Sequence, residues 1–267
     1  MVGRIVVAGC GRMGLPMLRA LRAAGFDAAG YDVKPAEALG ARPQEMIDAA
    51  AMRAEAEILI SVVRDAAETE ALLFSAEAAL SGPRLRTLIV SSTLSPRLLP
   101  GIAARAPAGL ELVDAPMSGA QVSAVERRLS FMLGGGADAL DRLEPLFRAM
   151  GTKLHRVGGF GAGMAAKVLN NYVAATSVAS VRQALDWAPE MGVSREDLLA
   201  VMSDSSGQTW FGTNFDRIEF ARHGWSADNT IAILMKDVEA ALDGAGAPED
   251  PLGRAAIGKI GRFKPYV

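Results

Sequence analysis

A chain of 267 residues is longer than most single domains, so two domains are the expected arrangement. The 28 basic and 30 acidic residues give a net charge of -2, and no run of like charges could follow a nucleic-acid backbone or an anionic membrane. The single Cys10 excludes an internal disulfide, and neither cysteine nor histidine has metal-ligand spacing. With neither a leader peptide nor the roughly 20 apolar residues of a membrane span, we expect a cytoplasmic protein without a metal.

The first part of the chain alternates between apolar, β-branched runs and segments of good helix formers. Strands are predicted at residues 4–8, 27–31, 58–63, 87–91, 110–114, 130–133 and 153–157. Helices are predicted at residues 15–24 and 67–80. Such alternation is typical of an α/β fold, a Rossmann-type doubly wound parallel sheet.

The second part of the chain shows no such alternation. It follows the glycine-rich run 158–163, and helices are predicted at residues 165–188, 195–202 and 230–242. We therefore predict a Rossmann-type domain at 1–160. An all-helical domain at 161–267 is predicted to begin with a long connecting helix.

A glycine-rich loop follows the first predicted strand and opens the first predicted helix. It reads Gly9-Cys10-Gly11-Arg12-Met13-Gly14, a G-x-G-x-x-G pattern. Such a loop needs one glycine in a backbone shape that a Cβ forbids, and another that lets main-chain N–H groups reach a pyrophosphate. The alternative is an ordinary tight turn, but the strand and helix on either side favour a dinucleotide site.

Asp32 ends the second predicted strand, 21 residues after Gly11. A carboxylate there can accept both hydroxyl groups of an adenosine ribose, and it would repel the additional phosphate of NADP. We therefore predict NAD as the cofactor in preference to NADP. Lys34 is the feature nearby that argues against this choice, and Asp32 as a turn residue before Pro35 is the alternative.

Lys167 is the only formally charged residue between Arg156 and Arg182. An isolated ammonium on a helix so rich in Ala, Val and Leu is costly unless it serves a polar cleft. Asn171 lies four residues on and shares its helical face, which places a proton donor beside an amide. The alternative is a lysine whose ammonium reaches the surface from a buried helix.

Five ordered segments complete a pattern that resembles the β-hydroxyacid dehydrogenases, of which 3-hydroxyisobutyrate dehydrogenase is the best known. The resemblance covers roughly residues 3 to 243 and is carried by 9–17 (GCGRMGLPM), 91–96 (SSTLSP), 114–119 (DAPMSG), 161–171 (GAGMAAKVLNN) and 236–237 (KD). It implies that residues 1–160 form a dinucleotide-binding Rossmann-type domain and that the helical domain at 161–267 serves substrate binding and oligomerisation. It also implies hydride transfer between NAD(P) and a small 3-hydroxy acid, and a homodimer or homotetramer.

The resemblance also implies roles for single residues. Lys167 is expected as the catalytic general acid or base, with Asn171 orienting the substrate. Ser118 and the backbone of Gly119 are expected to hold the substrate carboxylate. The cofactor contacts implied outside Asp32 are Gly9, Gly11, Arg12, Met13 and Gly14 in the loop, Thr93 and Lys236 at the nicotinamide end, and Val63 and Arg64 where the family usually has a Leu-Pro pair.

The chain departs from the family pattern in several places. Ala120, Val122 and Arg127 stand at positions that are usually small, which predicts a smaller or differently shaped substrate pocket. An extra charge at Arg64 is expected near the pyrophosphate. Two other functions remain open: an imine reductase-like enzyme, against which Lys167 argues, and a dinucleotide-binding protein without turnover. Trp210, Phe211 and Trp225 are interpreted either as walls of the active cleft or as packing residues.

Overall fold

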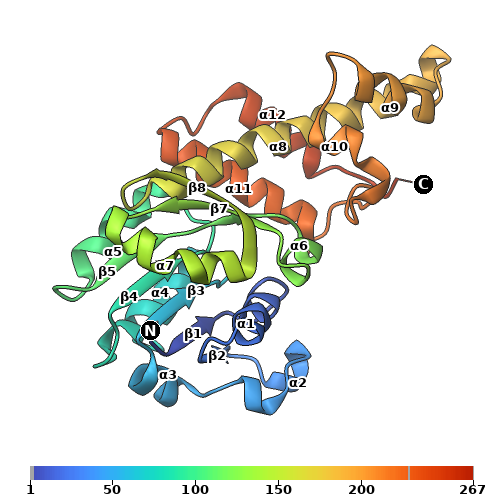
Figure 1. Cartoon of the computed structure of the whole chain (residues 1–267). Coiled ribbons are helices and arrows are strands. Elements are labelled where there is room, and N and C mark those ends of the chain that lie inside the picture. Colours follow the sequence, from blue (N-terminus) through green and yellow to red (C-terminus); the bar gives the residue numbers. More distant parts are fainter. Residues whose placement is uncertain (1–2, 228, 267) are drawn as a thin grey trace. The chain divides into compact units, whose positions relative to one another are not determined.

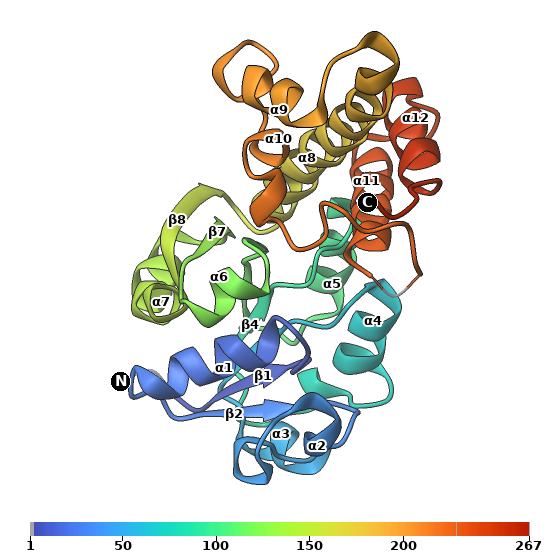
Figure 2. The same cartoon turned by 90° about the vertical axis from the view of Figure 1, so that its right-hand side faces the viewer.

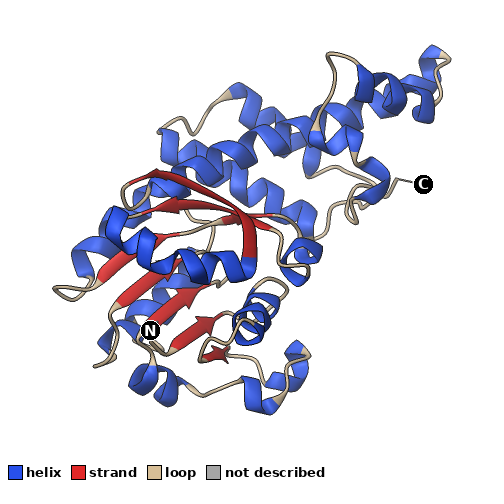
Figure 3. Cartoon of the chain, viewed as in Figure 1, coloured by secondary structure: helices blue, strands red, loops and turns tan. Residues whose placement is uncertain are grey.

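The computed structural model describes residues 3–227 and 229–266. The chain forms two compact units, residues 1–167 and residues 168–267 (Figure 1). Strands occur in the first unit, and the described residues of the second unit are helical or irregular (Figure 3). This confirms the predicted fold class, a Rossmann-type domain followed by an all-α domain.

The sheet of the first unit has the order β2-β1-β3-β4-β5-β7-β6, and β8 pairs with β7. Its strands are β1 (Ile5–Ala8), β2 (Ala28–Tyr31), β3 (Ile58–Ser61), β4 (Thr87–Val90), β5 (Glu111–Asp114), β6 (Met117–Ser118), β7 (Leu129–Gly134) and β8 (Gly151–Gly158). The seven predicted strands are all present, whereas the two-residue β6 was not predicted.

The sheet is parallel from β2 to β5 but mixed at its far edge. Strand β7 runs antiparallel to β5 and to β6, and β8 is parallel to β7. A parallel neighbour of β5 would need a crossover helix. The connection 115–128 holds β6 and a short helix instead, so the chain turns back along the sheet. The prediction of a parallel sheet therefore holds for five strands and is wrong for the edge.

Both faces of the sheet are buried, because successive strand side chains point to opposite sides. In β1, Ile5 and Val7 join a core with α1 (Gly14–Ala23) and α7 (Ala137–Met150). Val6 and Ala8 join a second core with α3 (Ala49–Glu55), α4 (Ala66–Phe74) and α5 (Leu99–Arg105). The helices on the two faces can be followed in Figure 2. The short helices α2 (Ala36–Leu39) and α6 (Gln121–Val125) complete this unit.

The second unit packs around the long helix α8 (Ala162–Trp187), within which the unit boundary falls. The other helices are α9 (Arg195–Asp204), α10 (Trp210–Thr213), α11 (Thr230–Ala245) and α12 (Pro251–Ile260). Their core includes Val178, Leu185 and Phe211. Within the described parts of the chain, no helix combines the length and apolar character needed to cross a membrane.

Candidate active site

The glycine loop lies at the carboxyl end of β1 and leads into α1. Gly9 has a φ of +95°, and a Cβ there would lie 2.7 Å from the carbonyl carbon of Val62, at the end of β3. A Cβ on Gly14 would overlap the carbonyl oxygen of Gly9. A Cβ on Gly11 would meet no protein atom within 4 Å. Two glycines are therefore required by the fold, and the third leaves open space beside the loop.

This loop stands where the order of the sheet reverses. Strand β1 lies between β2 and β3, and the helices that follow β1 and β3, α1 and α4, pack on opposite faces. In open α/β sheets, such a switch point opens a crevice beyond the carboxyl ends of the strands. No acidic residue occupies the first turn of α1, so its N–H groups can bind an anion. The loop therefore fits the pyrophosphate of a dinucleotide.

Asp32 follows β2 and is held against the same loop. Its Oδ2 accepts a hydrogen bond from the N–H of Cys10 at 2.8 Å, and its Oδ1 accepts one from the N–H of Lys34 at 2.9 Å. Each carboxylate oxygen has a further lone pair for a hydroxyl donor. The position and free acceptor capacity of Asp32 suit a ribose.

Cys10 lies inside the loop but is not a nucleophile. Its side chain is fully buried, and this burial, together with the negative charge of Asp32, raises the pKa of the thiol to about 12. The thiolate is the reactive form of cysteine, so the protonated Cys10 is a packing residue.

Two of the predicted cofactor contacts follow β3. Val63 is half-buried, and Arg64 is exposed. The Arg64 guanidinium pairs with Asp65 at 3.3 Å and with Glu68 at 3.1 Å. The extra charge expected at Arg64 is therefore balanced by two carboxylates on the start of α4. Thr93, which follows β4, is half-buried.

Ser118 ends β6, and Gly119 follows it in the turn that leads to α6. Ser118 pairs with Ser130 of β7, and Gly119 has a φ of +117°. A Cβ on Gly119 would lie 2.8 Å from the Cβ of Ser123, so this glycine allows α6 to pack on the turn. Two of the departures from the family lie just beyond: Val122 is 57% exposed, and Arg127 has a φ of +57°.

Lys167 lies in the second turn of α8 and is 7% exposed. Such burial is uncommon for lysine, and it argues against the alternative of an ammonium that reaches the surface. The apolar composition of α8 already indicated this position, because few other residues around it carry charge.

Asn171 belongs to a polar cluster of the second unit that joins α8 to α11. Its Nδ2 donates to the Oδ2 of Asp237 at 2.5 Å, and the Nζ of Lys236 lies 2.8 Å from the Oδ1 of Asp237. Asp237 is 3% exposed. A carboxylate only accepts hydrogen bonds, so Asp237 fixes which end of the Asn171 amide faces it.

Asp237 belongs to the last of the five family-like segments, but no role was predicted for it. A signal was present in the sequence: Asp237 lies among Ile231, Leu234, Val238 and Leu242, which form the apolar face of α11. A buried carboxylate on an apolar helical face requires a hydrogen-bond or ion-pair partner. Here the partners are Asn171 and Lys236.

The three aromatic residues interpreted either as walls of the active cleft or as packing residues differ in their exposure. Phe211 is 1% exposed and packs in the helical core, whereas Trp210 and Trp225 are 62% and 46% exposed.

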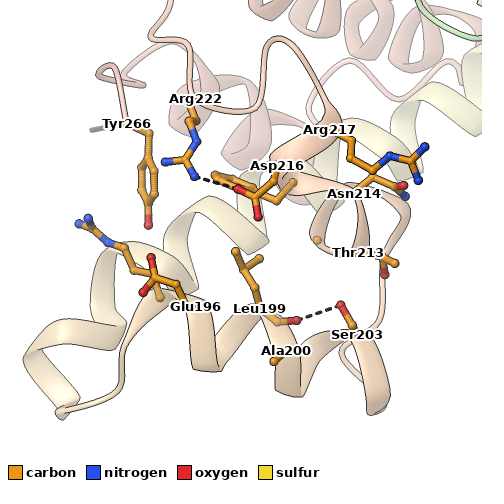
Figure 4. A pocket seen from close by; sticks show the side chains of 13 residues that line it. Glu196, Leu199, Ala200, Ser203, Thr213, Asn214, Asp216, Arg217, Arg222 and Tyr266 are labelled. Carbon is orange, nitrogen blue, oxygen red and sulfur yellow. Dashed lines mark hydrogen bonds and ion pairs between the residues drawn. The ribbon is translucent and has the colours of Figure 1, made fainter.

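A cavity of about 490 Å³ lies in the second unit, between α9 and the segment 212–217 (Figure 4). Its lining includes none of the predicted site residues, and the Arg222–Asp216 ion pair at 2.8 Å spans part of it. Within the described residues, no group of three metal-ligating side chains is found.

The glycine loop, Asp32 and the order of the strands are those of a dinucleotide-binding protein. Residues 4–159 match the profile of the NAD binding domain of 6-phosphogluconate dehydrogenase. Residues 161–257 match the NAD-binding domain of NADP-dependent 3-hydroxyisobutyrate dehydrogenase.

Relatives with known names support the same class. A 3-hydroxyisobutyrate dehydrogenase of Pseudomonas aeruginosa is 31% identical over 94% of this chain and 89% of its own. An NAD-dependent L-serine dehydrogenase of the same organism is 33% identical over 78% of this chain and 71% of its own. The structure of Mycobacterium tuberculosis 3-hydroxyisobutyrate dehydrogenase with L-serine, 28% identical, superposes with a TM-score of 0.79 over 97% of this chain and 92% of that one. The chain therefore belongs to the β-hydroxyacid dehydrogenase family, as predicted, and is an oxidoreductase of hydroxy acids.

Proposed function

We propose that this protein is an NAD-dependent dehydrogenase of a small 3-hydroxy acid, similar to 3-hydroxyisobutyrate, with Lys167 as its general acid and base. The observation that carries this proposal is the burial of Lys167, the one charged residue in the first half of α8. Burial of an ammonium costs solvation free energy, and a positioned lysine with access to substrate can act as a general acid or base.

The chain's residues divide the work of the reaction. A bound nicotinamide would supply the acceptor for the hydride that leaves the carbon carrying the hydroxyl group. Neutral Lys167 takes the hydroxyl proton as that hydride leaves, and the ammonium so formed returns the proton in the reverse direction. Asn171, whose amide is oriented by Asp237, holds the substrate oxygen. Ser118 and the N–H of Gly119 hold the substrate carboxylate.

The decisive experiment combines a substrate screen with a lysine variant. Small 2- and 3-hydroxy acids are offered with NAD, and reduced cofactor is measured by absorbance. With the best acid, Lys167→Met should lower kcat by about 10²- to 10⁴-fold, the usual contribution of general acid–base catalysis. The matched control is Lys153→Met, since Lys153 is exposed on β8. Wild-type turnover by Lys167→Met would refute the assignment, whereas NAD binding without oxidation of any acid would favour a protein without turnover.

The preference for NAD over NADP rests on Asp32. Its carboxylate is already turned towards the loop by the Cys10 N–H, where an added phosphate would meet a negative charge. The profile that residues 161–257 match is named NADP-dependent, whereas the similar L-serine dehydrogenase is named NAD-dependent. A kcat/KM that is higher with NADP, or an Asp32→Ala variant with an unchanged Kd for NAD, would show that this part of the proposal is wrong.

We also propose that the helical unit forms a homodimer or homotetramer. Several large apolar side chains of this unit are exposed, among them Val173 (64%), Trp187 (53%), Met191 (73%) and Leu252 (57%). Packing of a second copy of the chain on such side chains would remove apolar surface from water. Sedimentation equilibrium of the purified protein tests this, and a monomer at all concentrations would contradict it.

A further inference from the structure

One buried carboxylate has no part in the proposed chemistry. Asp114, at the end of β5, is 0% exposed. Burial raises its pKa to about 6, while the N–H groups that surround it act in the opposite direction. A buried acid of this kind needs donors to compensate its lost hydration, and its donors show what it holds in place.

The donors of Asp114 belong to the start of α8. The N–H of Gly161 donates to Oδ1 at 2.7 Å, and the N–H of Met164 donates to Oδ2 at 2.5 Å. Helix α8 begins at Ala162, and the N–H groups of a first helical turn have no partners inside the helix. Asp114 therefore caps α8 from a strand 47 to 50 residues earlier in the chain.

Two glycines allow this contact to be so close. A Cβ on Gly163 would lie 2.9 Å from the Oδ2 of Asp114 and 3.0 Å from the nitrogen of Gly134. A Cβ on Gly134 would overlap the Oδ1 of Asp114. The first turn of α8 therefore lies directly against the ends of β5 and β7.

The same turn is also held from the end of β4. The N–H of Leu94, the neighbour of Thr93, donates to the Sδ of Met164 at 3.3 Å. Met164 is fully buried. The first turn of α8 is thus fixed by two strand ends whose loops carry predicted site residues.

Lys167 follows Met164 by three residues and Gly163 by four, so it lies one helical turn above the capped groups. A rotation or shift of the first turn would move its ammonium by a similar amount, and misplacement by 1 Å can cost about 10²-fold in rate. We infer that Asp114 is a positioning residue, whose buried carboxylate holds the first turn of α8 and so places Lys167 for proton transfer. This inference rests on the proposed role of Lys167.

The test is Asp114→Asn, which keeps the size of the side chain but replaces one acceptor with a donor facing an N–H group. We expect kcat to fall at least 10-fold, with a calorimetric Kd for NAD within twofold of wild type, because the glycine loop follows a different strand. The matched control is Asp48→Asn, since Asp48 caps α3 by accepting from the N–H of Ala51 at 2.8 Å. This control should keep both kcat and Kd.

Wild-type kcat in Asp114→Asn, an equal loss of NAD affinity, or the same loss of kcat in Asp48→Asn would overturn the inference. If Asp114→Asn does not fold, Met164→Leu takes its place, because it keeps the volume but removes the sulfur contact with Leu94. That variant should lower kcat about 3-fold at unchanged Kd, and wild-type kcat would again overturn the inference. If Lys167→Met keeps its turnover, the proposed function fails; if Lys167→Met is inactive and Asp114→Asn is not, only this inference fails.

Discussion

Single substitutions in the glycine loop should separate the glycines that the fold needs from the one that a dinucleotide needs. A Cβ on Gly11 meets no protein atom within 4 Å, so Gly11→Ala introduces no steric clash in the free protein. It restricts the unfolded chain and should raise the free energy of unfolding by about 0.4–1 kcal/mol. A Cβ on Gly14 overlaps the carbonyl oxygen of Gly9, and backbone atoms cannot move aside cheaply. Gly14→Ala should lower the free energy of unfolding by about 3 kcal/mol.

Urea unfolding followed by circular dichroism, together with calorimetric titration with NAD, measures both effects. For Gly11→Ala we expect an unfolding midpoint at or above that of wild type and a Kd for NAD at least 10-fold higher, about 1.4 kcal/mol, because its Cβ enters the space where N–H groups approach a pyrophosphate. Gly101→Ala is the control, since Gly101 in α5 also has open space around it, and its Kd should not change. An unchanged Kd in Gly11→Ala would refute a dinucleotide over this loop, and an unchanged midpoint in Gly14→Ala would refute the packing argument.

Three further predictions concern stability. Arg182 is buried and donates to the carbonyl oxygens of Ala221, His223 and Lys264. Arg182→Met should therefore lower the free energy of unfolding in urea by about 2–4 kcal/mol. The control is Arg217→Met, which should stay within about 0.5 kcal/mol of wild type because Arg217 is exposed. Arg127 has a φ of +57°, and Arg127→Gly should gain about 1 kcal/mol by relieving a left-handed backbone; an equal gain in the neighbouring Arg128→Gly would contradict this reason. Burial raises the pKa of Asp114 from 3.8 to about 6, so the native state binds the proton more tightly than the unfolded state does. The tighter proton binding contributes about 3 kcal/mol to the free energy of unfolding below pH 3.8, and this contribution is lost as the pH rises through 6. Unfolding curves measured over a pH series should show this loss of stability in the wild type and not in Asp114→Asn.

The parts of the fold that the sequence predicted are those set by neighbouring residues. The strand, the glycine loop and helix α1 lie within residues 5–23, and the alternation of Ile5, Val6 and Val7 between two cores follows from strand geometry alone. Helix α7 was not predicted, although Leu143 and Phe147 on its buried face have helical spacing. Pro145 lies within it and breaks the pattern that identifies a helix.

The parts of the site that the sequence left undetermined are set by distant contacts. Asp114 meets α8 across about 50 residues, and Asp237 meets Asn171 across 66. Neither pairing has a local signature, because a capping carboxylate usually stands next to its own helix. The isolation of Lys167 was visible in the sequence, but the groups that hold its helix were not.

The proposed catalytic pair, Lys167 and Asn171, lies on a single helix, which fixes the rise between them at about 6 Å. What the helix itself cannot fix is its rotation and its depth, since both depend on packing. In the first unit, Asp114 fixes the rotation and depth of α8 by capping the turn that precedes Lys167. In the second unit, Asp237 does the same by accepting a hydrogen bond from the amide of Asn171. Each proposed catalytic side chain thus depends on a buried carboxylate of its own unit. Removing either carboxylate should therefore lower kcat by a larger factor than it raises the Kd for the dinucleotide.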